Sequence, residues 1–106
     1  MRRGEIWWIN FDPAIGSEIK KTRPAVIVSN NISNKYSNRC QVIPATSAVH
    51  KLYPPECFVK IEGRKSKVMA DQIMTVSEKR LVQLIGSVTA HEISEIDRII
   101  KLQLGL

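Results

Sequence analysis

The chain has 106 residues, which is enough for one domain around one core, so we expect residues 1–106 to form a single domain. The hydrophobic share of 43% and the charged share of 25% exclude a disordered, collagen-like or membrane-spanning chain. Sixteen Lys and Arg against ten Asp and Glu give a formal net charge of +6. Such a charge favours polyanionic partners such as nucleic acid, although it also serves solubility alone.

The first part of the chain predicts short strands separated by polar loops. Residues 5–11 are rich in Ile, Trp and Phe, which favour a strand. After a long polar loop over 14–23, the β-branched run at 24–29 predicts a strand buried on both faces. The Asn- and Ser-rich segment 30–38 predicts a loop with room for a short helical turn.

The middle of the chain continues the pattern with four more predicted strands. They are expected at residues 40–44, 57–61, 68–73 and 81–88. Between them we expect a long loop over 45–55, a charged turn over 62–67 around Gly63, and a turn over 77–80.

The end of the chain predicts one amphipathic helix, over about 90–104. Thr89 and Glu92 have the spacing of a capping box, in which each side chain bonds the backbone amide of the other residue. Isoleucines at 93, 96, 99 and 100 then recur at helical spacing. Short strands and one helix predict a mainly β fold, with a strongly bent sheet or small barrel and a helix over one face or opening. A face left uncovered would favour dimerisation.

Cys40 and Cys57 lie in strand-like segments without CxxC spacing, so we expect two free, partly buried thiols in a reducing cytosol. The N-terminal residues have no apolar signal core, and no run approaches transmembrane length. We therefore expect a cytoplasmic protein that does not associate with membranes.

Several motifs resemble the MazF/PemK family of toxins. They are RGEIWWINFDP at 3–13, GSE at 16–18, RPAVIVS at 23–29, VIPATS at 42–47 and ADQI at 70–73. The C-terminal helix also falls where this family has one, so the resemblance covers nearly the whole chain. It implies an SH3-like small barrel of antiparallel strands with a C-terminal α-helix. It further implies a homodimer, a cognate antitoxin partner and endoribonuclease activity on single-stranded RNA.

RNA cleavage without a metal uses the 2′-OH of the RNA, which attacks the adjacent phosphorus and leaves a 2′,3′-cyclic phosphate and a free 5′-OH. The protein supplies a cation beside the phosphate, a neutral donor, and a carboxylate or imidazole. No His, Cys or carboxylate cluster has metal-ligand spacing, and no Gly-rich nucleotide loop is present, so we expect neither metal nor cofactor. His50 and His91 belong to no matching motif, and we expect structural or surface roles for both.

The resemblance implies that Arg23 is catalytic. A guanidinium matches phosphate oxygens and stays protonated, so we expect it to stabilise the charge of the transition state. Thr46 matches a second family position, and its hydroxyl can donate to a phosphate oxygen; a local backbone bond is the structural alternative. Ser47 either assists Thr46 or caps the loop.

Two carboxylates are candidates for a supporting role. Glu18 could orient Arg23 or accept a proton, or form an ordinary surface ion pair. Asp71 matches an aspartate proposed as the base in some relatives. Those relatives carry an arginine where this chain has Met69 and a histidine where it has Ser17. Asp71 is therefore expected to order structure or contact a base, and the general base stays open.

RNA binding is expected in the loops on either side of this centre. The candidate phosphate contacts, or else plain solvated charges, are Lys20, Lys21 and Lys51. Phe11 or Tyr53 could stack on a base, and Phe11 could equally belong to the core. Strand alternation sends Trp7 and Trp8 to opposite faces, where core and interface roles are expected.

Two other functions are compatible with such a barrel. One is a non-enzymatic toxin similar to the CcdB gyrase poisons, which would lack an arginine–threonine centre. The other is a non-catalytic nucleic-acid-binding barrel. Incubation with RNA and EDTA separates them, because only the nuclease leaves cyclic-phosphate ends.

Overall fold

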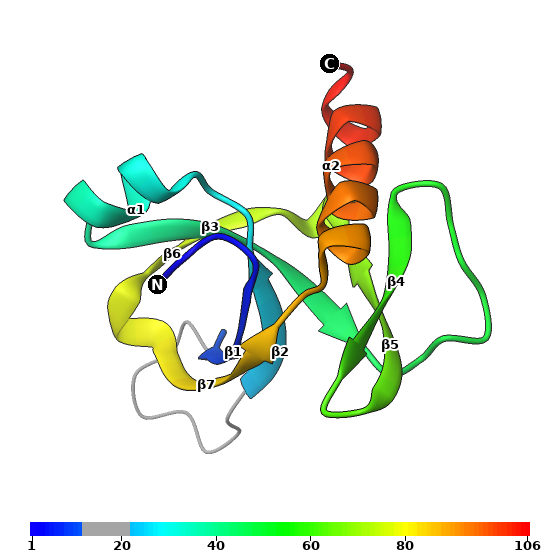
Figure 1. The fold of residues 1–106 in the computed structure, drawn as a ribbon, viewed down its shortest axis with the longest axis horizontal. Helices are drawn as coiled ribbons and strands as arrows, with labels where there is room; N and C mark the ends of the chain where they lie inside the picture. Colours follow the sequence, from blue (N-terminus) through cyan, green and yellow to red (C-terminus); the bar gives the residue numbers. More distant parts are fainter. Residues whose placement is uncertain (12–21) are drawn as a thin grey trace.

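A computed structural model describes residues 1–11 and 22–106 and shows a curled antiparallel sheet with one long helix beside it (Figure 1). The strands are β1 (Glu5–Asn10), β2 (Thr22–Ile27), β3 (Arg39–Thr46), β4 (Glu56–Ile61), β5 (Arg64–Met69), β6 (Met74–Ser77) and β7 (Leu81–Ser87). The α-helices are α1 (Asn31–Tyr36) and α2 (Ala90–Leu104), and the 3₁₀ turns are η1 (Ala70–Gln72) and η2 (Glu78–Arg80).

Strand β3 is where the sheet divides. The strand order is β4-β5-β3-β2-β1-β7, and β6 also pairs with β3. The first half of β3 pairs with β6, through Arg39 to Val42, whereas Ala45 and Thr46 at its end pair with β5. One edge of a single strand thus serves two partners, and the sheet curls around it (Figure 1). This confirms the prediction of a mainly β, barrel-like fold with a C-terminal helix.

The core has two parts, one on each face of β2 and β3. Val26 and Ile43 point into the larger cluster, which also receives Ile96 and Ile99 of α2. Their strand neighbours point the other way: Ala25, Ile27 and Val42 form the smaller cluster together with Ile9, Cys40 and Val76. The prediction that residues 24–29 form a strand buried on both faces is therefore confirmed in substance, with β2 beginning two residues earlier and ending at Ile27.

Both cysteines are free and buried, as predicted. Burial raises the pKa of Cys40, and it raises the pKa of Cys57 to about 11. Since the thiolate is the reactive form, burial and a raised pKa both act against reactivity of these thiols.

Helix α2 has the predicted bounds and start. The Thr89 hydroxyl accepts from the Glu92 amide at 3.1 Å, and the Glu92 carboxylate accepts from the Thr89 amide at 2.8 Å. The other carboxylate oxygen of Glu92 accepts from the amide of Lys60 at 2.7 Å, on the free edge of β4. Gly105 ends the helix in the left-handed conformation, with φ of 73°. Glu92 therefore caps the helix and covers part of a strand edge.

The segment from 62 to 80 corrects two predictions. The expected charged turn over 62–67 is only two residues long, because Glu62 and Gly63 both have positive φ, 52° and 77°, as in a tight hairpin turn. Strand β5 therefore begins at Arg64, and the expected strand over 68–73 is wrong, since the chain turns in η1 after Met69. Strand β6 was not predicted, because Val76 is its one buried residue and leaves little apolar pattern.

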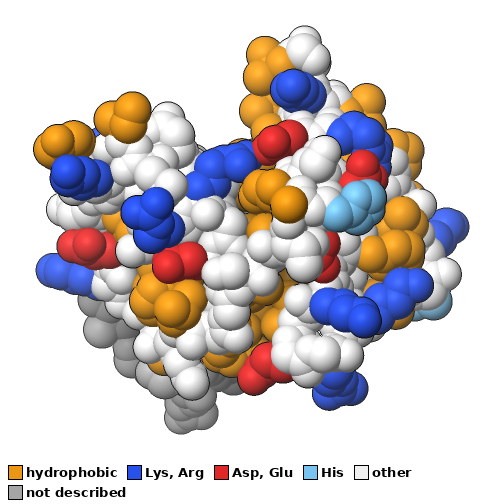
Figure 2. Space-filling view, in the orientation of Figure 1, with side chains coloured by type: hydrophobic (Ala, Val, Ile, Leu, Met, Phe, Trp, Pro, Cys, Tyr) orange, Lys and Arg blue, Asp and Glu red, His pale blue; other side chains and the backbone are white. Residues whose placement is uncertain are grey.

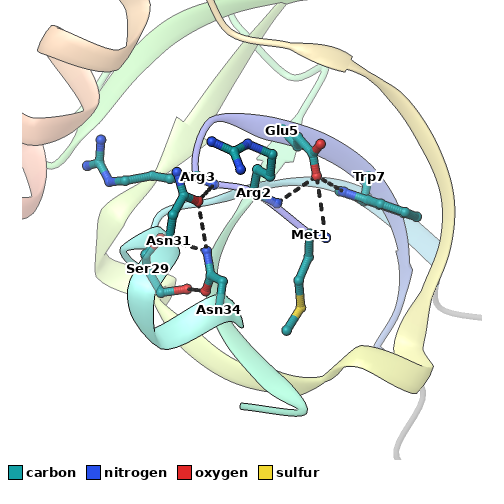
Figure 3. A network of polar contacts seen from close by, with 8 residues as sticks. All are labelled: Met1, Arg2, Arg3, Glu5, Trp7, Ser29, Asn31 and Asn34. Atoms are coloured by element: carbon teal, nitrogen blue, oxygen red, sulfur yellow. Dashed lines mark hydrogen bonds and ion pairs between the residues drawn. The ribbon is translucent and has the colours of Figure 1, made fainter. Parts of the chain in front are cut away.

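Two polar networks fix the N-terminal segment beside β1 and α1 (Figure 3). The Glu5 carboxylate accepts from the Arg2 amide at 2.7 Å and from the Trp7 indole at 3.0 Å. The side-chain oxygen of Asn31 at the start of α1 accepts from the amide of Arg3 at 2.7 Å. These bonds fix the start of β1. Pairing with β2 and β7 fixes the rest of the strand.

Arg3 also joins the N-terminal segment to the last helix. Its Nε donates to the carbonyl of Val28 at 2.9 Å, and its guanidinium pairs with Asp97 of α2. The N-terminal segment, the end of β2 and α2 are thereby linked around the larger core cluster.

Candidate active site

A hollow of about 480 Å³ opens where the start of β2, the end of β3 and the β4–β5 turn converge. These elements meet in the lower half of Figure 1. The hollow is lined by Trp8, Arg23, Pro24, Ala45, Thr46, Ser47, Ile61, Glu62, Arg64 and Ser66. It brings together the two residues expected to be catalytic and the serine expected to assist them.

Backbone register explains why Arg23 and Thr46 share this hollow. Strands β2 and β3 are antiparallel, with Ala25 opposite Pro44. Two further residues along each strand lead to Arg23 and Thr46, which are therefore expected opposite each other. Arg23 is also fixed on its other side, since it pairs with Ile9 of β1. Both residues are thus positioned by paired strands, which hold a site more rigidly than free loops do.

The hydroxyl of Thr46 makes the local bond that the structural alternative anticipates. It accepts from the amide of Ala48 at 3.2 Å. Because the oxygen is the acceptor in this bond, the hydroxyl hydrogen stays available to a ligand. The bond also fixes the first turn of the loop after β3, where Ser47 is exposed beside the hollow.

Arg64 is a second cation of the hollow that sequence reasoning missed. It is the first residue of β5, it is exposed, and it lines the hollow together with Ser66. Val68, Ser66 and Arg64 alternate along one face of β5, with Val68 in the larger core cluster. Recognising a two-residue turn at Glu62–Gly63 in the sequence would have placed the start of the next strand at Arg64.

Asp71 lies outside this hollow. It is exposed in η1, and among the described residues it lines neither this hollow nor the adjacent smaller one. The smaller hollow, of about 290 Å³, is lined by Phe11, Arg23, Pro44, Gln72 and Met74. Arg23 thus separates two hollows, and Phe11, which packs against the smaller core cluster, reaches the second one.

Lys51 and Tyr53 lie in the loop between β3 and β4 and do not line either hollow. The Lys51 ammonium is 5.2 Å from the centre of the Tyr53 ring. His50, in the same loop, is exposed, as is His91 in the first turn of α2. The remaining predicted residues, Glu18, Lys20 and Lys21, lie outside the described residues.

The two tryptophans of β1 do point to opposite faces. Trp7 packs against the smaller core cluster, whereas Trp8 lines the hollow beside Pro24. Trp8 therefore presents an aromatic surface to whatever occupies the hollow.

Within residues 1–11 and 22–106, no group of three or more His, Cys, Asp or Glu side chains is arranged to hold a metal ion. In the same part of the chain, no helix has the length and apolarity needed to cross a membrane. The described lining of the hollow instead offers two guanidinium groups, hydroxyl groups and the carboxylate of Glu62. Such groups suit a phosphate diester, since guanidinium donors match phosphate oxygens and hydroxyls donate to them.

A family model described as the PemK-like, MazF-like toxin of type II toxin–antitoxin systems matches residues 2–104. The chain belongs to this family of toxins. It is 39% identical over 115 residues to Endoribonuclease MazF9 of Mycobacterium tuberculosis, across 100% of this chain and 98% of that protein. It is 32% identical over 112 residues to Endoribonuclease MazF of Staphylococcus epidermidis, across 100% of this chain and 92% of the relative.

Solved structures of MazF proteins share the fold. MazF from Deinococcus radiodurans superposes with a TM-score of 0.81 at 26% identity, covering 100% of this chain and 97% of that one. A mycobacterial endoribonuclease in complex with its cognate antitoxin superposes with a TM-score of 0.84 at 22% identity, covering 100% and 96%. Both curated MazF relatives are named endoribonucleases, which supports endoribonuclease activity in this MazF-like chain.

Proposed function

We propose that this chain is the toxin of a type II toxin–antitoxin system and cuts single-stranded RNA at specific sequences without a metal ion. The observation that carries the proposal is the hollow that Arg23 and Thr46 line together, from the adjacent strands β2 and β3. Its basic lining fits one phosphodiester of a polyanion, and the net charge of +6 draws RNA towards it. The cytoplasm, where mRNA is found, is the inferred site of action.

In the proposed reaction the 2′-OH loses its proton and its oxygen attacks the adjacent phosphorus, while the bond from phosphorus to the 5′-oxygen breaks and that oxygen takes up a proton from water. The products are a 2′,3′-cyclic phosphate and a 5′-OH end. Arg23 stabilises the negative charge on the non-bridging oxygens, and Thr46 donates its hydroxyl hydrogen to one of them. Arg64, at the start of β5, adds a second positive charge to the hollow.

Two carboxylates are candidates for accepting the proton of the 2′-OH. Glu62 lines the hollow at the β4–β5 turn, and Glu18 belongs to the segment outside the described residues. Asp71 is assigned a supporting structural role, since it does not line the hollow. The pH dependence of cleavage by Glu62→Gln and Glu18→Gln variants identifies the acceptor, because loss of the base removes the acidic limb of the profile.

The decisive experiment is incubation of the purified protein with a long single-stranded RNA in EDTA. We expect discrete fragments with 2′,3′-cyclic phosphate and 5′-OH ends. A gyrase poison or a non-catalytic binding barrel would leave the RNA intact. Cleavage that stops on chelation and returns with added metal would contradict the metal-independent mechanism.

An antitoxin protein and a second copy of the chain are the proposed partners. A mycobacterial endoribonuclease has been solved with its cognate antitoxin on the same fold, and an acidic, partly disordered segment would complement the basic hollow. Support for a homodimer comes from large apolar side chains that the described surface leaves exposed, including Val82, Leu84, Leu102 and Leu104. Light scattering of the isolated chain tests the dimer.

A further inference from the structure

The outer face of the β4–β5 hairpin carries aromatic and basic side chains outside the hollow. Alternation sends Val59 and Ile61 into the core and leaves Phe58 and Lys60 on the outside. Lys65 of β5 lies on the same outer face, and Lys51 and Tyr53 of the preceding loop continue it. We call these five residues (Lys51, Tyr53, Phe58, Lys60 and Lys65) the aromatic–lysine strip.

The strip is continuous because each ring is in contact with a lysine. The Lys65 ammonium lies 4.0 Å from the centre of the Phe58 ring. Phe58 is paired across the strands with Lys67, whose ammonium lies 5.4 Å from the centre of the Tyr53 ring. Tyr53 and Phe58 stay 51% and 37% exposed, so their rings are accessible to a ligand. Figure 2 shows basic and hydrophobic side chains side by side over this hairpin, on the right of the view.

Two lysines of the strip repel each other. Lys60 and Lys65 lie directly opposite each other on paired strands, where like charges are unfavourable. In the described part of the chain neither forms an ion pair. The carboxylate of Glu92, which accepts from the Lys60 amide, is already engaged by two backbone amides. A polyanion would relieve the repulsion between these two lysines, and the exposed rings of Tyr53 and Phe58 offer surfaces on which bases can stack.

We propose that the aromatic–lysine strip binds the single-stranded RNA that flanks the scissile phosphate, an inference that rests on the proposed ribonuclease function. Bases stack on Tyr53 and Phe58, and the lysines contact the phosphates between them. Stacking of a base is stronger than an exposed cation–π contact, so a base displaces Lys65 from the Phe58 ring and frees its ammonium for a phosphate.

The strip and the hollow are connected through the same two chain segments. The inner side of the hairpin turn supplies Glu62 and Arg64 to the hollow, while the outer side carries Lys60 and Lys65. The loop that leaves the hollow at Ser47 leads to Lys51 and Tyr53. RNA that leaves the hollow over the turn or along the loop therefore meets the strip directly.

A buried ion pair holds the strip in its binding form. Lys67 and Glu56 are each 7% exposed, with 2.9 Å between the ammonium and the carboxylate. The ammonium also donates to the carbonyl of Lys51 at 2.7 Å, and the carboxylate accepts from the amide of Tyr53 at 2.8 Å. The loop is thus fastened to the hairpin before RNA arrives, and little ordering is needed on binding.

Binding of a labelled 2′-O-methyl oligouridylate measures the strip without cleavage, because this probe lacks the nucleophilic hydroxyl. For a probe of about twenty nucleotides, we expect Phe58→Ala to weaken binding about tenfold and Phe58→Trp to restore it. Lys60→Ser combined with Lys65→Ser removes two phosphate contacts, so the slope of log K against log salt falls by about 1.4. A probe of about six nucleotides is too short to occupy both the hollow and the strip, so its affinity should change less in each variant.

The matched control is another exposed lysine–tyrosine pair, in α1, where the Lys35 ammonium lies 5.5 Å from the centre of the Tyr36 ring. Lys35→Ser with Tyr36→Ala should leave binding of the long probe unchanged. Equal losses in the control and strip variants would overturn the proposal, as would wild-type binding by the strip variants. Wild-type RNA binding combined with lost affinity for a polyglutamate peptide would identify a protein-binding surface instead and would also overturn it.

The two proposals fail in different ways. If the wild-type protein leaves RNA uncut but binds the probe through the strip, the nuclease function is wrong and the strip is still a nucleic-acid surface. If RNA is cut in an Arg23-dependent manner while the strip variants bind and cut long RNA normally, only the strip proposal is wrong. Thermal unfolding of each variant establishes that it is folded.

Discussion

The two regions proposed to contact RNA are held in place by different forces. Arg23 and Thr46 are positioned by the backbone bonds of β1, β2, β3 and β5, which no side-chain replacement at either residue removes. The loop with Lys51 and Tyr53 is held by one backbone bond, from the Glu56 amide to the Tyr53 carbonyl, and by the buried ion pair Glu56–Lys67. Replacing Arg23 or Thr46 should therefore change activity without changing the fold. The position of the loop, in contrast, depends on the charges of Glu56 and Lys67 and hence on pH.

Among the substitutions considered, Arg23→Ala is expected to have the largest effect, on RNA cleavage in the hollow. We expect kcat/KM for RNA cleavage to fall roughly a thousandfold, because a charge-stabilising donor is lost from the transition state. Arg23 is exposed, so the unfolding temperature should be unchanged. Arg39→Ala, at an exposed arginine away from the hollow, is the control and should cut normally. Undiminished cleavage by Arg23→Ala would place the centre elsewhere.

Glu56→Gln tests how much the buried Glu56–Lys67 pair contributes to stability. It leaves the Lys67 ammonium buried without its counter-ion, and we expect a loss of about 3 kcal/mol in the free energy of unfolding at neutral pH. The exposed pair of Glu95 and Arg98 is the matched control. Glu95→Gln should leave the unfolding free energy unchanged within error in urea titrations.

The pH dependence of this loss follows from the pKa of Glu56. Burial alone would raise it, but the Tyr53 amide and the Lys67 ammonium outweigh burial and hold it below its ordinary value of 4.5. A carboxyl group with a lowered folded pKa stabilises the protein above its unfolded pKa, and this contribution disappears as the pH falls through the folded pKa. The difference between wild type and Glu56→Gln should therefore narrow below pH 4.5. A difference that is constant from neutral pH into this range would show that the pair is not ionised.

Replacements at Thr46 and Asp71 sharpen the boundary of the hollow with smaller effects. Thr46→Val keeps the branched shape but removes the hydroxyl, and we expect about a thirtyfold fall in kcat/KM from the loss of a hydrogen bond to a charged group. Asp71→Asn should stay within about twofold of wild type, since a surface charge outside the hollow contributes little. Single-turnover rates of cleavage of the same RNA by the two variants and by the wild type test this expectation. A larger effect at Asp71 than at Thr46 would reverse their proposed roles.

The sequence predicted those elements whose pattern is local and strong. β2 is a β-branched run and α2 has a capping box and an isoleucine stripe, and both appear as expected, α2 with its predicted bounds. β5 and β6 were misjudged because their bounds depend on a left-handed turn and on pairing with β3, neither of which leaves an apolar pattern. For the same reason Arg64 was missed as a lining residue of the hollow.

The candidate site was predicted through family motifs more than through physical pattern. Nothing in the local sequence brings Arg23 and Thr46 together; they share a hollow because the fold places β2 beside β3. The sequence offers both Phe11 and Lys51 as RNA contacts, with the core as the alternative for Phe11, but the structure places them in different regions, beside the smaller hollow and on the outer loop. Distances between segments far apart in the chain were beyond local reasoning.

The two bonds of the Glu92 carboxylate also bear on aggregation through the edge of the sheet. Its carboxylate holds the first turn of α2 and also occupies an amide on the free edge of β4, where another chain could otherwise add a strand. Fraying of the helix would thus uncover a template for intermolecular β-pairing. One side chain in this toxin couples helix integrity to protection against aggregation.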